Sequence, residues 1–101
     1  MPSLPKILGI DIGSVSIAVA AVSSQHQIVQ SDYAFHHGNP AAGLADILSR
    51  FDLAGIGAVA VTDATPDIVK ADRRFDSKVS VMRAVRCLQP DAGCILVVGG
   101  E

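Results

Sequence analysis

A short apolar stretch that ends in a carboxylate and a glycine turn constrains this chain most. Leu8-Gly9-Ile10 leads into Asp11, and Gly13-Ser14 separates this stretch from a second apolar run. A glycine permits a tight chain reversal, and backbone N–H groups in such a turn can point at phosphoryl oxygens. A carboxylate beside the turn can hold a magnesium ion through water. The stretch therefore predicts either an ordinary hairpin turn or part of a phosphate-binding site.

Hydrophobic periodicity predicts three strands at the start of the chain. We expect a buried strand at residues 6–11, a strand rich in Val, Ile and Ala at 14–22, and an alternating strand at 27–35. In the third strand, Val29, Tyr33 and Phe35 fall on one face. The polar links between these strands are short, which favours antiparallel hairpins.

Two helices and a fourth strand are predicted next. Asn39 is a good N-cap and Pro40 suits the first helical position, and apolar residues follow at helical spacing. These apolar residues are Leu44, Ile47, Leu48 and Phe51. A fourth strand is expected at 56–62, followed by a polar loop. The second helix is expected from residue 76 or 77 to 88, because Pro90 just beyond would stop it.

A continuous β-branched run at 94–98 predicts a last strand that is buried on both faces. The order β-β-β-α-β-α-β is that of a ribonuclease H-like unit. Right-handed crossovers place strands four and five parallel to strand one, in a five-stranded mixed sheet of order 3-2-1-4-5 with helices packed on it. We therefore predict an α/β fold in which residues 1–101 form a single lobe without an internal repeat. Ligands of such sheets collect at the carboxyl end of strand one, where Asp11 lies.

Composition narrows the function classes. Hydrophobic residues make up 50% of the chain, which is enough for the core of one small domain. A net charge of −2 without a run of Lys or Arg argues against nucleic-acid binding. We expect no membrane span and no signal peptide, and hence a cytoplasmic protein. Cys87 and Cys94 are then expected to be reduced thiols, since two cysteines make neither a disulfide framework nor a four-ligand zinc site.

Four motifs together resemble the BadF/BadG/BcrA/BcrD-type ATPase family. They are Leu8-Gly-Ile-Asp-Ile-Gly-Ser14, the helix entry Phe35-His-His-Gly-Asn-Pro40, the triplet Val61-Thr-Asp63, and the ending Ile95-Leu-Val-Val-Gly-Gly-Glu101. Members of that family are activators of 2-hydroxyacyl-CoA dehydratases, within the superfamily of actin, sugar kinases and large heat-shock chaperones. The resemblance implies that residues 1–101 are the N-terminal half of a two-lobed ATPase domain, without its second lobe.

The resemblance also implies an ATP-driven electron donor. In the intact parent, ATP and Mg²⁺ would lie between two lobes. A homodimer would hold one [4Fe-4S] cluster and pass a low-potential electron to a dehydratase-type CoA enzyme. The ligands of that cluster follow the second phosphate turn in the family, so neither Cys87 nor Cys94 is expected to bind it.

Site residues follow from the same resemblance. Asp11 would be the catalytic carboxylate that positions Mg²⁺ through water. The phosphate contacts would be Gly13, Ser14 and Ser16, and a second phosphate turn would be formed by Gly99 and Gly100.

Two positions depart from the family pattern. Ala18 stands where many members have a Lys that reaches the phosphates. Val97 stands where an acidic residue usually precedes the second turn, which leaves Glu101 as the nearby carboxylate. We therefore expect ATP binding to be better preserved than hydrolysis, and the isolated fragment to be inactive. The alternative is a non-catalytic regulatory or dimerisation lobe, and a sugar or small-acid kinase lobe ranks below it.

Other polar residues have simpler explanations. His36 and His37 are adjacent, so on a strand they point to opposite faces and do not suit a single metal ion. Asp63 and Asp67 either line the nucleotide cleft or serve as turn residues.

Two surface features bear on partners. Arg73, Arg74 and Lys78 are interpreted as a solvated face at the start of the second helix, and partner docking is the less favoured interpretation. Apolar surface near the cleft, which the missing lobe would otherwise cover, predicts that the chain associates with itself.

Overall fold

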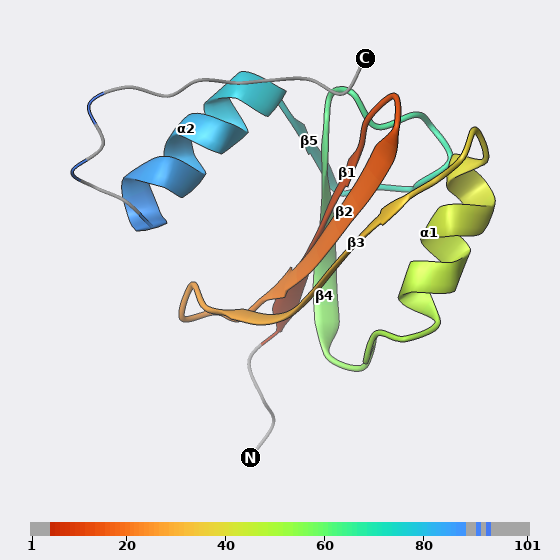
Figure 1. Ribbon diagram of the computed structural model, residues 1–101. Coiled ribbons are helices and arrows are strands. Elements are labelled where there is room, and N and C mark those ends of the chain that lie inside the picture. The colour runs from red at the N-terminus through yellow and green to blue at the C-terminus, as the bar shows by residue number, and fades with distance from the viewer. Residues whose placement is uncertain (1–4, 89–90, 92, 94–101) are drawn as a thin grey trace.

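A mixed sheet of five strands forms the frame of the molecule over the described residues (Figure 1). The computed structural model describes residues 5–88, 91 and 93. Its strands are β1 (Lys6–Ile12), β2 (Ser16–Val22), β3 (Ile28–Phe35), β4 (Ile56–Thr62) and β5 (Arg73–Phe75), and its helices are α1 (Pro40–Leu48) and α2 (Ser77–Leu88). The strands lie in the order β3-β2-β1-β4-β5. Neither helix is long and apolar enough to cross a membrane.

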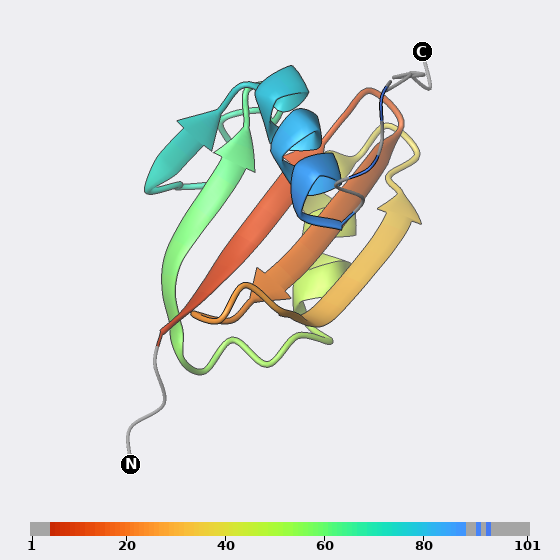
Figure 2. The same ribbon diagram turned by 90° about the vertical axis from the view of Figure 1, so that its left-hand side faces the viewer.

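Strand directions follow from the connections between them. Short links join β1 to β2 and β2 to β3, and both pairs are antiparallel. β4 follows α1 and lies parallel to β1. α1 covers one face of the sheet and α2 lies over the other, as Figure 1 and Figure 2 show from two directions. The predicted α/β class and the sheet order 3-2-1-4-5 are confirmed.

The structure differs from the sequence prediction in the segment that lies beside β4. That place is taken by β5, whose residues the sequence analysis assigned to no strand. The strand predicted at 94–98 lies outside the described residues. A loop, rather than a helix, connects β4 to β5. Asp72 secures it, because its N–H donates to the Val59 carbonyl (2.8 Å) and its carboxylate accepts from the Val59 N–H (2.7 Å). A strand of three residues is too short to show a periodic pattern. Its conformation is therefore set by pairing with β4 and not by its own sequence.

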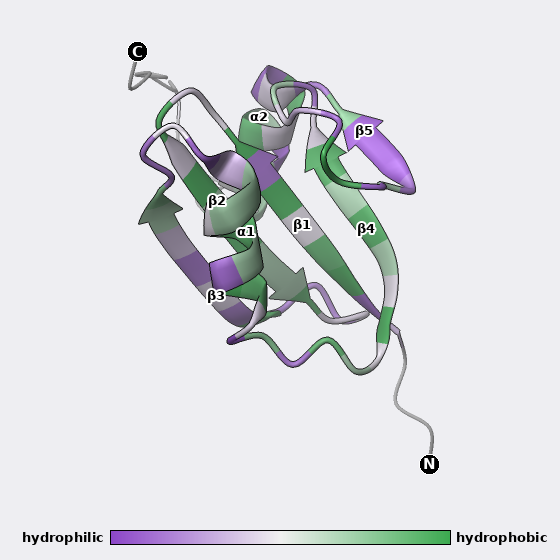
Figure 3. Cartoon of the chain, turned by 90° about the vertical axis from the view of Figure 1, so that its right-hand side faces the viewer, coloured by the Kyte–Doolittle hydropathy of each residue, from purple (hydrophilic) through white to green (hydrophobic). Residues whose placement is uncertain are grey.

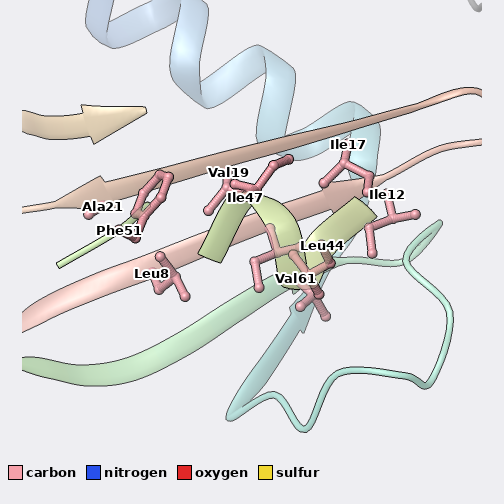
Figure 4. Close-up of a cluster of buried hydrophobic side chains, with 10 residues drawn as sticks. Leu8, Ile12, Ile17, Val19, Ala21, Leu44, Ile47, Phe51 and Val61 are labelled. Carbon is pink, nitrogen blue, oxygen red and sulfur yellow. The ribbon is translucent and has the colours of Figure 1, made fainter. Parts of the chain in front are cut away.

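The hydrophobic core lies between the sheet and α1 (Figure 4). Alternate residues of β1 and β2 point toward α1, as the pleat requires. Figure 3 shows the hydrophobic residues gathered on β1, β2 and β4. The buried apolar side chains are Leu8, Ile10, Ile12, Ile17, Val19, Ala21, Leu44, Ile47, Phe51 and Val61.

α1 begins at the predicted residue and packs closely on β2. Asn39 Oδ1 accepts the Ala42 N–H at 3.2 Å, and Pro40 occupies the first turn. A Cβ at Gly43 would lie 2.9 Å from Cδ1 of Ile17, so the glycine allows the helix to approach the strand. The second helix also has its predicted extent, from Ser77 to Leu88.

Charged residues tie β3 to the end of α1. Asp32 accepts hydrogen bonds from Arg50 Nη2 and from the Tyr33 N–H, both at 2.8 Å, and Arg50 also pairs with Asp46 at 2.8 Å. The hydrogen bond from Arg50 is the main cause that lowers the pKa of Asp32 below its usual value. With this polar side of β3 turned to α1, Tyr33 and Phe35 remain 60% and 57% exposed.

Candidate functional site

The carboxyl ends of β1 and β4 bring Asp11 and Thr62 together. Asp11 is the next-to-last residue of β1 and Thr62 is the last residue of β4, and the two strands run parallel. The Thr62 hydroxyl donates to Asp11 Oδ1 at 2.6 Å. Asp11 therefore lies where ligands of such sheets collect, with one carboxylate oxygen already oriented.

A second hydroxyl supports this contact from the interior. Thr65 is only 2% exposed, and its Oγ1 accepts the N–H of Ile12 at 3.0 Å. The two threonine hydroxyls lie 3.0 Å apart. Because the hydroxyl proton of Thr62 goes to Asp11, the Thr65 hydroxyl is the donor of this pair, and it shares its proton with the Ile10 carbonyl at 3.4 Å. The resulting chain of donors ends on Oδ1, and within the described residues no donor reaches the other oxygen of Asp11.

The turn between β1 and β2 is held by its own backbone and by His36. The Gly13 N–H donates to the Ser16 carbonyl at 2.9 Å, so this N–H is not available to a ligand. The Gly13 carbonyl lies 2.9 Å from the ring nitrogen Nε2 of His36. The backbone N–H of His36 donates to the Val15 carbonyl at 3.0 Å. His36 Nδ1 accepts the Gly38 N–H at 3.1 Å, which assigns the ring proton to Nε2. His36 thus donates to the turn.

Donors remain unused at the tip of this turn. In the part of the chain that the structure describes, the N–H groups of Ser14 and Val15 and the Ser14 hydroxyl have no hydrogen-bond partner. Adjacent unpaired N–H groups in a turn suit an anion. Ser16 begins β2 and is partly buried, whereas Ser14 is exposed. The other proposed phosphate contacts, Gly99 and Gly100, lie outside the described residues, as do Val97 and Cys94.

The loop after β4 engages its polar residues within itself and with α2. Asp63 accepts from the Ser77 hydroxyl and from the Ser77 N–H (3.2 Å), at the start of α2. The Ser77 hydroxyl is the main cause that lowers the pKa of Asp63 below its usual value. Arg74 donates to the carbonyls of Thr62 (3.0 Å) and Thr65 and pairs with Asp67 (3.1 Å). Asp63 and Asp67 therefore act as loop residues here, and Arg74 fastens the loop instead of forming a solvated face.

An open groove runs from Asp11 between the sheet and α2. Its volume is about 970 Å³. Small-molecule sites span roughly 300–1,000 Å³, so the groove lies at the upper end of that range. Asp11, Thr62, Ser77 and Ser80 supply polar lining, and apolar lining comes from Ala18, Ala20, Val22, Val81 and Ala84 among others. Within the described residues there is no cluster of three side chains able to ligate a metal.

Three of the supporting residues, Thr62, Thr65 and His36, were not predicted as site residues. Thr62 stands in the Val61-Thr-Asp63 triplet, so its place at the end of a strand was visible in the sequence. Thr65 contacts Ile12 across 53 positions of chain and His36 contacts Gly13 across 23. No local pattern signals such contacts, although a buried hydroxyl generally needs a partner.

The sheet order and the position of Asp11 define the class of fold. The chain is a ribonuclease H-like and actin-like α/β unit with a carboxylate at the end of its central strand. A solved structure similar to it is the activator of the 2-hydroxyisocaproyl-CoA dehydratase from Clostridium difficile with bound ADPNP, at a TM-score of 0.68 and 21% sequence identity. The match covers 86% of this chain and 35% of that chain, so this chain spans about a third of its length. No protein-family model and no curated protein matches the sequence.

Proposed function

We propose that this chain is the N-terminal nucleotide-binding lobe of an ATP-hydrolysing activator of the BadF/BadG/BcrA/BcrD type. The intact protein would drive low-potential electron transfer to a 2-hydroxyacyl-CoA dehydratase or a related CoA-substrate enzyme. One observation carries the proposal: Asp11 is oriented by Thr62 at the end of β1, beside a turn with unused N–H donors. The shared fold with a dehydratase activator that binds ADPNP supports it.

The chemistry of the site suits Mg²⁺ and a phosphate chain. Mg²⁺ keeps several waters and takes few protein carboxylates. Thr62 uses one oxygen of Asp11, which leaves the other to accept a hydrogen bond from a metal-bound water. Bound Mg²⁺ would neutralise phosphate charge. The task of Asp11 is to hold and orient that water, and Ser14 and Val15 donate to phosphoryl oxygens from the turn.

One feature favours a second candidate, a non-catalytic regulatory or dimerisation lobe. Ala18 is the register partner of Asp11 on β2, and both line the groove. Its methyl group brings no charge to the place where a Lys would meet the phosphates. The isolated chain therefore binds Mg-ATP weakly at most and does not turn it over. The iron–sulfur cluster belongs to the proposed homodimeric parent, and no residue of this chain is assigned to it.

An NMR titration of the chain with Mg²⁺ and ADPNP tests the proposal. We expect the amide signals of Ser14 and Val15 to shift and the shift to be lost in Asp11→Asn. Asp52→Asn is the matched control, because Asp52 is an exposed carboxylate that can keep its bond to the Ala54 N–H as an asparagine. Unmoved turn amides would refute nucleotide binding by this lobe and leave the regulatory lobe as the better account.

A further inference from the structure

The charges of this chain are segregated along its length. Residues 70–88 carry six basic and two acidic side chains, and residues 6–69 carry two basic and six acidic ones. The segment that forms β5 and α2 therefore has a net charge of +4, within a chain whose net charge is −2. Such a local excess attracts a surface of opposite charge.

α2 turns two different faces to its surroundings. Ser77, Ser80, Val81 and Ala84 line the groove against the sheet. Val79, Met82, Arg83 and Arg86 recur at i, i+3, i+4 and i+7, so they share the opposite, outward face.

The outward face combines exposed apolar side chains with unpaired cations. Val79 is 49% exposed and Met82 is 53% exposed. Arg83 and Arg86 on this face, and Lys78 beside it, form no ion pair with any residue that the structure describes. An apolar centre with a charged rim is the composition of a protein–protein interface.

We propose that this outward face of α2 docks an acidic protein surface, one that presents an apolar patch rimmed by carboxylates. Helical rise gives α2 a length of about 18 Å, which suits a small and transient interface. A membrane surface fits less well, because the apolar side chains of this face among the described residues are Val79 and Met82, and neither is aromatic. Nucleic acid fits less well, since no aromatic side chain of α2 can stack on a base. The proposal is independent of the nucleotide site.

A labelled helical peptide of Leu and Glu is the probe, and the same peptide with Gln in place of Glu is its control. We expect the chain to bind the Glu peptide and Arg83→Glu/Arg86→Glu to weaken binding about tenfold, because each substitution replaces an attraction to a carboxylate with a repulsion. Lys70→Glu/Arg73→Glu makes the same charge change outside the helix and should weaken binding less than about twofold. Circular dichroism verifies folding, and Arg83→Gln/Arg86→Gln replaces the first variant if that one unfolds.

Three outcomes would overturn the proposal. Equal losses in both double variants would mean that the overall field, and not this face, attracts the peptide. Unchanged binding by Val79→Ser/Met82→Ser would reduce the contact to ion exchange. Tighter binding to phosphatidylserine vesicles or to duplex DNA than to the Glu peptide would assign the face to a different class of partner.

Discussion

His36 donates from Nε2 to the carbonyl oxygen of Gly13 across 2.9 Å, although 23 positions separate the two residues. The acceptor is the first residue of the turn whose Ser14 and Val15 N–H groups have no partner among the described residues. A side chain that follows β3 thereby fixes the conformation of the turn between β1 and β2. The conformation of the candidate phosphate turn is thus held by a side chain from outside the turn.

Removal of this imidazole should loosen the turn. We expect His36→Ala to lower the free energy of unfolding by about 2 kcal/mol, because the ring makes two hydrogen bonds and each contributes about 1 kcal/mol. Amide exchange at Ser14 and Val15 should accelerate by more than this global change explains. His26→Asn is the control, because His26 is exposed at φ +63°, a conformation that asparagine tolerates. Unchanged exchange at the turn in His36→Ala would contradict the role assigned to His36.

We expect the buried Thr65 hydroxyl to contribute strongly to the free energy of unfolding. Thr65→Val keeps the shape of the side chain but leaves the Ile12 N–H without its acceptor. A buried unsatisfied donor costs about 1–3 kcal/mol, and we expect a loss of that size in urea denaturation. Thr65→Ser retains the hydroxyl and should recover most of it. A stable Thr65→Val together with a destabilised Thr65→Ser would assign the effect to the methyl group instead.

We expect the first turn of α2 to lose stability at acidic pH. The lowered pKa of Asp63 means that its contribution to stability is complete above the unfolded-state value of 3.8 and is lost as the pH falls through the lower folded-state pKa. Far-UV circular dichroism should therefore show wild-type helix melting with acid, and Asp63→Asn should lack this component. Asp67→Asn, on the same loop, should keep it. An identical acid profile for the wild type and Asp63→Asn would contradict a stabilising contact between Asp63 and Ser77.

Periodicity and caps were enough to predict most of the frame. The alternation in β1 and β2 and the Asn39-Pro40 start of α1 are local signals, and the structure follows them. β5 escaped prediction because Arg73–Phe75 is too short for a pattern and is a strand only by pairing with β4. The role of Asp11 as a site residue was predicted from its motif. The hydrogen bonds of Thr62 and Thr65 at this site could not be predicted, because only the folded chain brings residues 51 to 55 positions apart into contact.

Exposed aromatic side chains on the edge strand should promote self-association. The rings of Tyr33 and Phe35 lie 5.8 Å apart in an edge-to-face arrangement on β3, which is an edge of the sheet. We expect concentration-dependent sedimentation of the wild type and a shift toward monomer in Tyr33→Ser/Phe35→Ser. Leu53→Ser is the control, because Leu53 is 47% exposed in a loop. A monomeric wild type over a wide range of concentration would refute this prediction.

A lysine placed opposite Asp11 should strengthen nucleotide binding. Ala18 pairs with Asp11 in the register of β1 and β2, and Ala20 lies two residues further from the turn on the same face. We expect Ala18→Lys to raise the affinity for Mg-ADPNP about tenfold, since a close cation–phosphate contact contributes roughly 1.4 kcal/mol. Ala20→Lys adds the same charge and should change the affinity less than about twofold. Calorimetry measures both. An equal rise in the two variants would show that net charge alone attracts the nucleotide. No rise in either would place the phosphates away from the Asp11 end of β1.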